Sequence, residues 1–91
     1  MAGIGKKRTI FTFTAPDAQE VYLCGTFNDW DLTKNPMRRD GQGGWKAQLL
    51  LPPGRYEYRF RVDGVWLDDP AAEEYVENPH GSRNAVREIK P

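Results

Sequence analysis

The sequence is poor in the residues that build covalent cross-links and metal sites. Its 91 residues include one cysteine, Cys24, and one histidine, His80. A single cysteine excludes an intrachain disulfide framework, and together with one histidine it supplies too few ligands for a cysteine/histidine zinc site. We therefore expect no metal and no cofactor, and a reducing, cytoplasmic location.

Long apolar runs and a net charge are also missing. No apolar stretch approaches the roughly 20 residues of a membrane span, and no apolar segment of the kind found in secretory signals follows the basic residues near Met1. Lys and Arg number 13, as do Asp and Glu, so the formal net charge is zero. This balance argues against a domain-wide basic surface for nucleic acid or an anionic membrane.

The length limits the chain to one domain. A chain of 91 residues leaves about 40% of its unfolded surface exposed after folding. Its core is therefore thin, and we do not expect a catalytic cleft beside it. We expect residues 1–7 to form a flexible N-terminal segment and residues 8–91 to form a single folded domain.

Apolar and polar residues alternate with a period of two, which predicts β-strands. The clearest case is residues 55–63, where one face carries Tyr56, Tyr58, Phe60 and Val62. Further strands are predicted at 8–14, 20–25, 37–39, 45–51, 65–67 and 84–90. Asp63–Gly64 is typical of a two-residue hairpin turn, and residues 71–76 are too short for an isolated helix, so we expect a loop there. Six to eight strands joined by Gly/Pro turns predict an all-β, antiparallel β-sandwich.

Candidate catalytic groups are few and poorly placed. Asp68 and Asp69 are sequence neighbours that would point to opposite faces of a strand, whereas glycosidases need two carboxyl groups flanking one bond. We expect both to be turn residues before Pro70. His80 lies in a turn without a nucleophile motif, and Cys24 is expected to pack half-buried on a strand. We expect no catalytic residue.

The tryptophans differ in their surroundings. Trp45 alternates in phase with Leu49 and Leu51 and is expected in the core. Trp30 lies in a polar loop, and Trp66 follows a hairpin turn. Either both rings cap the ends of the sandwich, or they form an exposed apolar surface that a partner covers.

A pyranose ring fits such a surface. Its apolar C–H face can stack on an indole, and its hydroxyls can bond to Arg, Asn and Ser side chains. Arg59, on the polar face of its strand, has a fork of donors suited to paired hydroxyls; alternatively it belongs to a solvated face with Glu57 and Arg61. Single-stranded nucleic acid also stacks on aromatic rings, but it requires a basic groove as well.

Three segments of the sequence resemble a known family. Residues 21–30, VYLCGTFNDW, are similar to the VYLxGxFNxW segment of the glycogen-binding domains of AMP-activated kinase β subunits. The same segment resembles the N-terminal modules of isoamylases and glycogen branching enzymes (carbohydrate-binding module family forty-eight). Residues 51–66, LPPGRYEYRFRVDGVW, resemble the family's LPxGxYxYKFxVDGxW, and residues 69–70 and 81–86 complete the order. The resemblance covers about residues 8–90.

The resemblance implies an immunoglobulin-like β-sandwich that binds an α-1,4-glucan without catalysing a reaction. It places Trp30 and Trp66 at two tryptophans that cradle glucose units. The remaining site positions hold Arg59 for a basic residue that is usually lysine, Ser82 for a threonine, Asn84 for an asparagine and His80 for a leucine. Histidine replaces an aliphatic side chain with a ring that can stack or hydrogen-bond, and arginine keeps the charge with another geometry.

We therefore predict stacking of glucose on two indole rings that are exposed on one side of the sandwich and parallel enough to hold adjacent glucose units. The predicted partners are glycogen, starch or a malto-oligosaccharide, besides a partner protein, with neither nucleic acid nor a membrane. Two alternatives stay open. The chain could be an adaptor that mediates protein contacts, or the N-terminal module of a glycoside hydrolase or branching enzyme that acts on α-glucans.

Overall fold

The computed structural model describes residues 5–91 as eight strands and one short 3₁₀ helix. In chain order the elements are β1 Lys7–Thr14, β2 Val21–Gly25, η1 Thr26–Asn28, β3 Arg38–Arg39, β4 Gly44–Leu51, β5 Gly54–Val62, β6 Val65–Leu67, β7 Glu74–Glu77 and β8 Arg83–Ile89. Residues 1–4 of the expected N-terminal segment lie outside the described residues, and Lys7 already belongs to β1. None of the described residues forms a long apolar helix of the kind that could span a bilayer.

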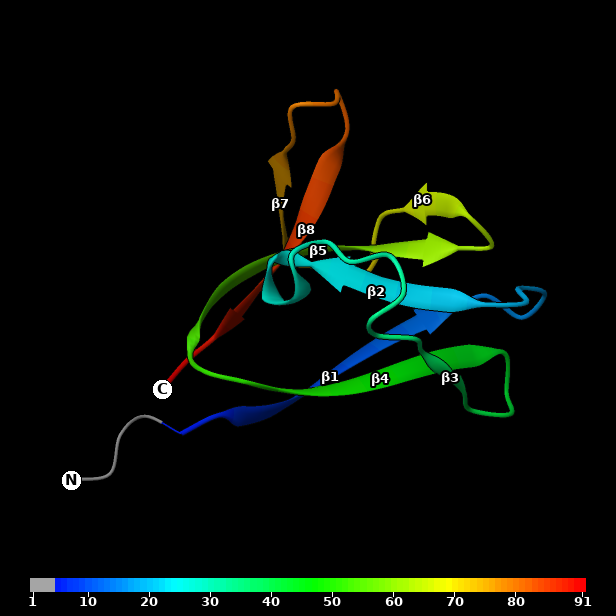
Figure 1. Ribbon diagram of the computed structural model, residues 1–91, viewed down its shortest axis with the longest axis horizontal. Helices are drawn as coiled ribbons and strands as arrows, with labels where there is room; N and C mark the ends of the chain where they lie inside the picture. Colours follow the sequence, from blue (N-terminus) through cyan, green and yellow to red (C-terminus); the bar gives the residue numbers. More distant parts are fainter. Residues whose placement is uncertain (1–4) are drawn as a thin grey trace.

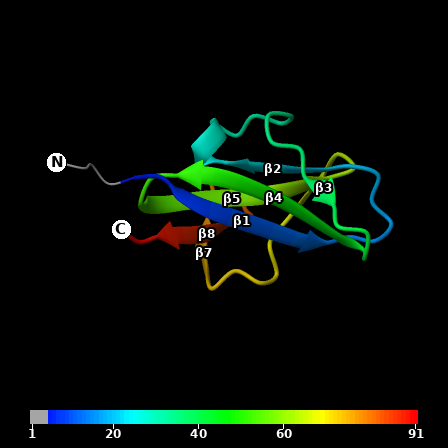
Figure 2. The same ribbon diagram turned by 90° about the horizontal axis from the view of Figure 1, so that it is seen from below.

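The strands form two antiparallel sheets. One sheet has three strands in the order β1-β4-β3, and the other has five, in the order β2-β5-β8-β7 with β6 beside β5. The sheets lie as two layers, with β1 and β4 across β5 and β8 (Figures 1 and 2). This arrangement confirms the predicted immunoglobulin-like antiparallel β-sandwich.

The core lies between the sheets and follows the two-residue alternation. On β5, Tyr58 and Phe60 are 2% and 0% exposed. From the opposite sheet, Phe11 of β1 packs against Tyr58 with ring centroids 4.9 Å apart, and Phe13 packs against Phe60 at 4.5 Å. Trp45 is buried as predicted, and its indole N–H donates to the carbonyl of Ala15 at 2.9 Å. Because the aromatic side chains fill this side of β5, its other side is left for polar residues.

The hairpin predicted at Asp63–Gly64 is confirmed. β5 pairs antiparallel with β6, and φ is 48° at Asp63 and 84° at Gly64, as a tight hairpin turn requires. The Asp63 carboxylate accepts hydrogen bonds from the backbone amides of Gln19 and Glu20, each at 2.9 Å. The turn is therefore fastened to the residues that lead into β2.

The loop expected over residues 71–76 is wrong, because β7 occupies Glu74–Glu77 and pairs with β8. The Tyr75 hydroxyl donates to the carbonyl of Asp69, and the Tyr75 ring lies 3.8 Å from Cζ of Arg83. Both contacts join Tyr75 to residues no more than eight positions away in the sequence. β7 has its apolar residues Tyr75 and Val76 side by side between two glutamates, so it lacks the alternation that predicted the other strands.

Cys24 is more buried than the sequence predicts, with 0% of its surface exposed. The chain returns alongside β2 after η1: the Leu23 amide donates to the carbonyl of Asn35 at 2.9 Å, and the Met37 amide donates to the carbonyl of Val21 at 2.8 Å. Burial raises the pKa of the Cys24 thiol. The reactive thiolate is therefore disfavoured at neutral pH.

Gly25 leaves no room for a side chain. An added Cβ would lie 2.5 Å from the carbonyl oxygen of Glu57 and 2.8 Å from the ring of Phe27. We expect Gly25→Ala to lower the free energy of unfolding by about 1–3 kcal/mol, because the backbone of β5 must move. Urea denaturation followed by tryptophan fluorescence measures this change.

Gly54→Ala is the matched control. Its added Cβ would meet only Tyr56, at an ordinary contact distance of 3.5 Å. We expect its free energy of unfolding to stay within about 0.5 kcal/mol of the parent value. An equal loss in the two variants would contradict the steric explanation.

Candidate functional site

A groove of about 630 Å³ lies on the outer face of the five-stranded sheet. It is lined by residues from the loop after η1, from β5 and β6, and from the loop into β8: Trp30, Glu57, Arg59, Trp66, Asn78, Pro79, His80, Ser82 and Asn84. All six site residues predicted from the sequence are in this set. The fold thus brings together side chains from four separate segments of the chain.

Trp30 reaches the groove from an unusual backbone. Asp29 and Trp30 have φ angles of 55° and 59°, a left-handed conformation that costs about 1–2 kcal/mol for a residue with a Cβ. The Trp30 amide donates to the carbonyl of Gly25 at 2.9 Å. This strained conformation must be stabilised by the surrounding loop.

Asn28 supplies that stabilisation. Its buried side chain accepts a hydrogen bond from the Gly25 amide at 3.1 Å and donates to the carbonyl of Leu23 at 3.0 Å. It also donates to Oδ1 of Asn35 at 2.6 Å. One amide side chain therefore joins the end of β2 to both ends of the loop that carries Trp30.

Trp66 stands beside Trp30 but not parallel to it. Trp66 pairs with Arg61 across the β5–β6 ladder and is 36% exposed. The two indole centroids are 6.5 Å apart, and the ring planes meet at 66°. The rings adopt the edge-to-face arrangement that aromatic pairs prefer, so their planes are inclined to each other. Together they form an angled corner of the groove.

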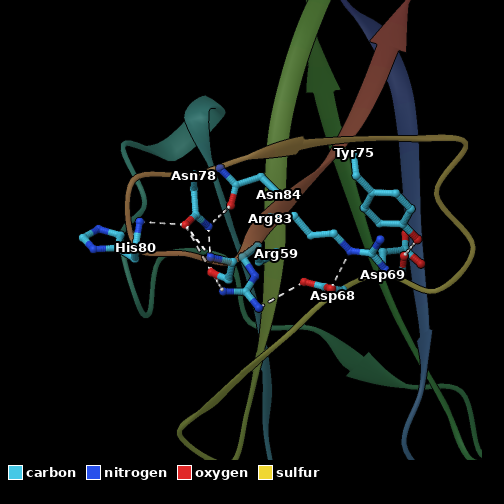
Figure 3. A network of polar contacts seen from close by, with 9 residues as sticks. Arg59, Asp68, Asp69, Tyr75, Asn78, His80, Arg83 and Asn84 are labelled. Atoms are coloured by element: carbon cyan, nitrogen blue, oxygen red, sulfur yellow. Dashed lines mark hydrogen bonds and ion pairs between the residues drawn. The ribbon is translucent and has the colours of Figure 1, made fainter.

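Arg59 is already bonded within the protein (Figure 3). Its Nη2 donates to Oδ1 of Asp68 at 3.0 Å, and its Nη1 donates to Oγ of Ser82 at 3.3 Å. Asp68 also accepts from Nε of Arg83 at 2.9 Å. The alternative of a solvated face with Glu57 and Arg61 is wrong for Arg59, because its side chain is 15% exposed and forms an ion pair with Asp68. Asp68, expected as a turn residue, is also the ion-pair partner of Arg83. Cζ of Arg59 lies 5.9 Å from the Trp66 centroid, within cation–π range.

Asn78 organises the loop between β7 and β8 (Figure 3). Its Nδ2 donates to Oγ of Ser82 at 2.9 Å and to Oδ1 of Asn84 at 3.0 Å. Its Oδ1 accepts from the amides of His80 and Ser82 at 3.0 and 3.2 Å, as in an Asx turn. The Asn78 side chain therefore holds the loop together, and the exposed imidazole of His80 lies at its tip.

Asn84 and Glu57 form the polar floor of the groove. Asn84 is 7% exposed, and its Nδ2 donates to Oε1 of Glu57 at 3.0 Å. Sequence reasoning missed Glu57, Asn78 and Pro79 as groove residues. For Glu57 a signal was available, since it alternates in phase with Arg59. For Asn78 the sequence showed only a turn. Within residues 5–91, no group of three or more His, Cys, Asp or Glu side chains is placed to hold a metal ion.

The sandwich fold and a groove that pairs indole faces with hydrogen-bonding side chains are the features of a carbohydrate-binding module. Residues 7–91 match the family described as "Glycogen recognition site of AMP-activated protein kinase". The chain belongs to this family, which confirms the resemblance found in the sequence motifs.

Several relatives share most of this chain. Subunit beta-1 of 5'-AMP-activated protein kinase from Rattus norvegicus is 40% identical over 82 residues, which are 90% of this chain and 28% of that protein. Subunit beta-2 from Mus musculus is 38% identical over 72 residues, 79% of this chain and 26% of that protein. Protein FLOURY ENDOSPERM 6, chloroplastic, from Oryza sativa subsp. japonica is 38% identical over 77 residues, 85% of this chain and 14% of that protein. The chain thus spans less than a third of each of these relatives.

The anchoring role of Asn28 can be measured. We expect Asn28→Ala to lower the free energy of unfolding by about 2–3 kcal/mol, because buried backbone groups lose their partners. Urea denaturation measures the loss, and near-ultraviolet circular dichroism should report the altered packing of Trp30. Thr33→Ala is the control, because this exposed hydroxyl has a single contact at 3.4 Å with Asp31. Equal stability of the two variants would show that Asn28 does not anchor the loop.

Proposed function

We propose that this chain is a non-catalytic module that binds α-1,4-glucans such as glycogen, starch or malto-oligosaccharides. The observation that carries the proposal is that Trp30 and Trp66 line one groove together with Arg59, Asn84 and His80. Membership of a glycogen-recognition family supports the same ligand class. Indole faces would take the apolar faces of glucose rings, and the polar side chains would bond to their hydroxyls.

The angle between the indoles suits this ligand. Successive glucose units of an α-1,4-linked chain are tilted relative to one another, so the chain curves. Two faces that meet at 66° can support neighbouring tilted rings, whereas a flat platform favours a straight chain. Arg59, Asn84 and His80 are the proposed contacts to hydroxyls. Ser82 has its hydroxyl engaged by Arg59 and Asn78, so it acts mainly by positioning them.

The groove is better suited to binding than to hydrolysis. Glu57 carries the single carboxylate among the lining residues. One of its oxygens accepts a hydrogen bond from the Asn84 side chain. Glycoside hydrolysis uses two carboxyl groups across one bond. Any catalysis on the glucan would therefore belong to another segment of a longer polypeptide or to a partner protein. The cytoplasmic location stays a prediction.

Removing either indole should remove most of the binding. One stacking contact contributes about 1–2 kcal/mol, so we expect Trp30→Ala and Trp66→Ala each to weaken maltoheptaose binding by about tenfold. The parent dissociation constant should lie between roughly micromolar and millimolar. Isothermal titration with maltoheptaose and native gels cast with glycogen measure the two effects.

Trp45→Phe is the matched control, because Trp45 is 5% exposed and lies in the core. This variant should keep its retention on glycogen, and urea denaturation should confirm that all three variants are folded. Unchanged retention of both the Trp30 and the Trp66 variants would refute the site. A parent chain that shows no fluorescence change with millimolar maltoheptaose would favour the alternative of an adaptor domain.

A further inference from the structure

The edge of β4 is only partly covered. β4 pairs with β1 along its whole length, Gly44–Leu51. On its other edge, β3 pairs with β4 only at Trp45 and Lys46. Within residues 5–91, residues 47–51 of β4 therefore have no neighbouring strand on that side. Their backbone groups on this edge are available to another strand.

The open edge results from the path of the chain before β3. Asn35 and Met37 are hydrogen-bonded to β2, so this segment follows the five-stranded sheet rather than β4. Between it and β4 lies a second groove of about 360 Å³, lined on one side by residues 47–49 and on the other by residues 34–36. The groove thus runs beside the part of β4 that lacks a partner.

The rim of this groove is basic. Lys34, Arg38 and Lys46 are exposed, and within the described part of the chain none of them has a carboxylate oxygen at ion-pair distance. Arg38 and Lys46 pair directly across the ladder, so two like charges face each other. Asp40 is the acidic residue of the lining, and its Oδ1 accepts from the amides of Gln42 and Gly44.

We infer that this groove is an interaction site for an extended acidic segment of a partner protein, which adds as a strand to the free edge of β4. Five residues of β4 offer a strand of about 17 Å for backbone pairing. Carboxylates of the added strand would lie near Arg38 and Lys46 and relieve their mutual repulsion. The occupant is therefore defined by an extended backbone and by negative charge.

A second copy of this chain fits the edge less well. Pairing two β4 edges would bring the cations of one copy close to those of the other, and like charges across a ladder are destabilising. Charged residues on an edge discourage such self-association. The same charges attract an acidic strand, so they select between the two occupants.

Fluorescence anisotropy with the 91-residue chain tests this site. The probe is a fluorescein-labelled peptide of about nine residues in which glutamate alternates with valine or threonine. We expect saturable binding that weakens as ionic strength rises. The double variant Arg38→Ser/Lys46→Ser should bind the peptide about tenfold more weakly. Saturating maltoheptaose should leave the peptide affinity unchanged, because the two grooves share no lining residue.

Two controls separate strand addition from simple charge attraction. Arg55→Ser/Lys90→Ser removes the same charge from exposed positions outside the three-stranded sheet. It also removes the exposed ion pair of Arg55 with Glu74, which lies away from β4, so it should change the affinity by less than about twofold. Two further peptides carry N-methyl groups on every second backbone amide, one on the odd-numbered and one on the even-numbered residues. Both keep their carboxylates, but the one whose methylated amides face β4 cannot pair with it, so it should bind at least about tenfold more weakly. The inference would be overturned if the unmethylated peptide did not bind, or if neither methylated peptide bound more weakly. An equal loss of affinity in both double variants or displacement of the peptide by maltoheptaose would also overturn it, as would self-association of the chain that the peptide does not reverse.

Discussion

The two-sided alternation of β5 is the constraint on which the rest of the structure depends. One side of this strand places Tyr58 and Phe60 in the core, and the other places Glu57 and Arg59 in the groove. β2, β6 and β8 all pair with β5, so its register also sets the position of Trp66. A slip by one residue would turn the arginine inward and the aromatic rings outward. The core and the groove are therefore specified by the same pattern.

The polar side chains of the groove hold one another in place. Arg59 is fixed by Asp68 and Ser82, and Asn84 is fixed by Asn78 and Glu57. A ligand would meet ordered side chains, which reduces the entropy lost on binding. The same bonds compete with sugar hydroxyls, so a new polar contact largely exchanges one hydrogen bond for another. Most of the affinity should then come from the apolar surface of the indoles.

Sequence patterns predicted which side chains of most strands are buried, but they missed contacts that each strand makes with other segments of the chain. The faces of β5, the hairpin at Asp63–Gly64 and the core position of Trp45 all followed from alternation or turn chemistry. The resemblance to the family predicted six site residues, and all six line one groove. The pairing of β7, the two ion pairs of Asp68 and the angle between the indoles depend on contacts between side chains of different elements, which the alternation along a single strand does not report.

The formal net charge of zero conceals an uneven distribution. At the glucan groove, Asp68 is ion-paired with Arg59 and Arg83, and Glu57 adds a second negative charge that balances these two arginines. A neutral sugar cannot neutralise a cation that it covers, and covering an uncompensated charge costs free energy, so this compensation favours an uncharged ligand. At the β4 edge, Lys34, Arg38 and Lys46 have no such compensation within residues 5–91. Uncompensated charge attracts an oppositely charged partner during approach. Because the two grooves share no lining residue, the proposed acidic segment would not compete with the glucan.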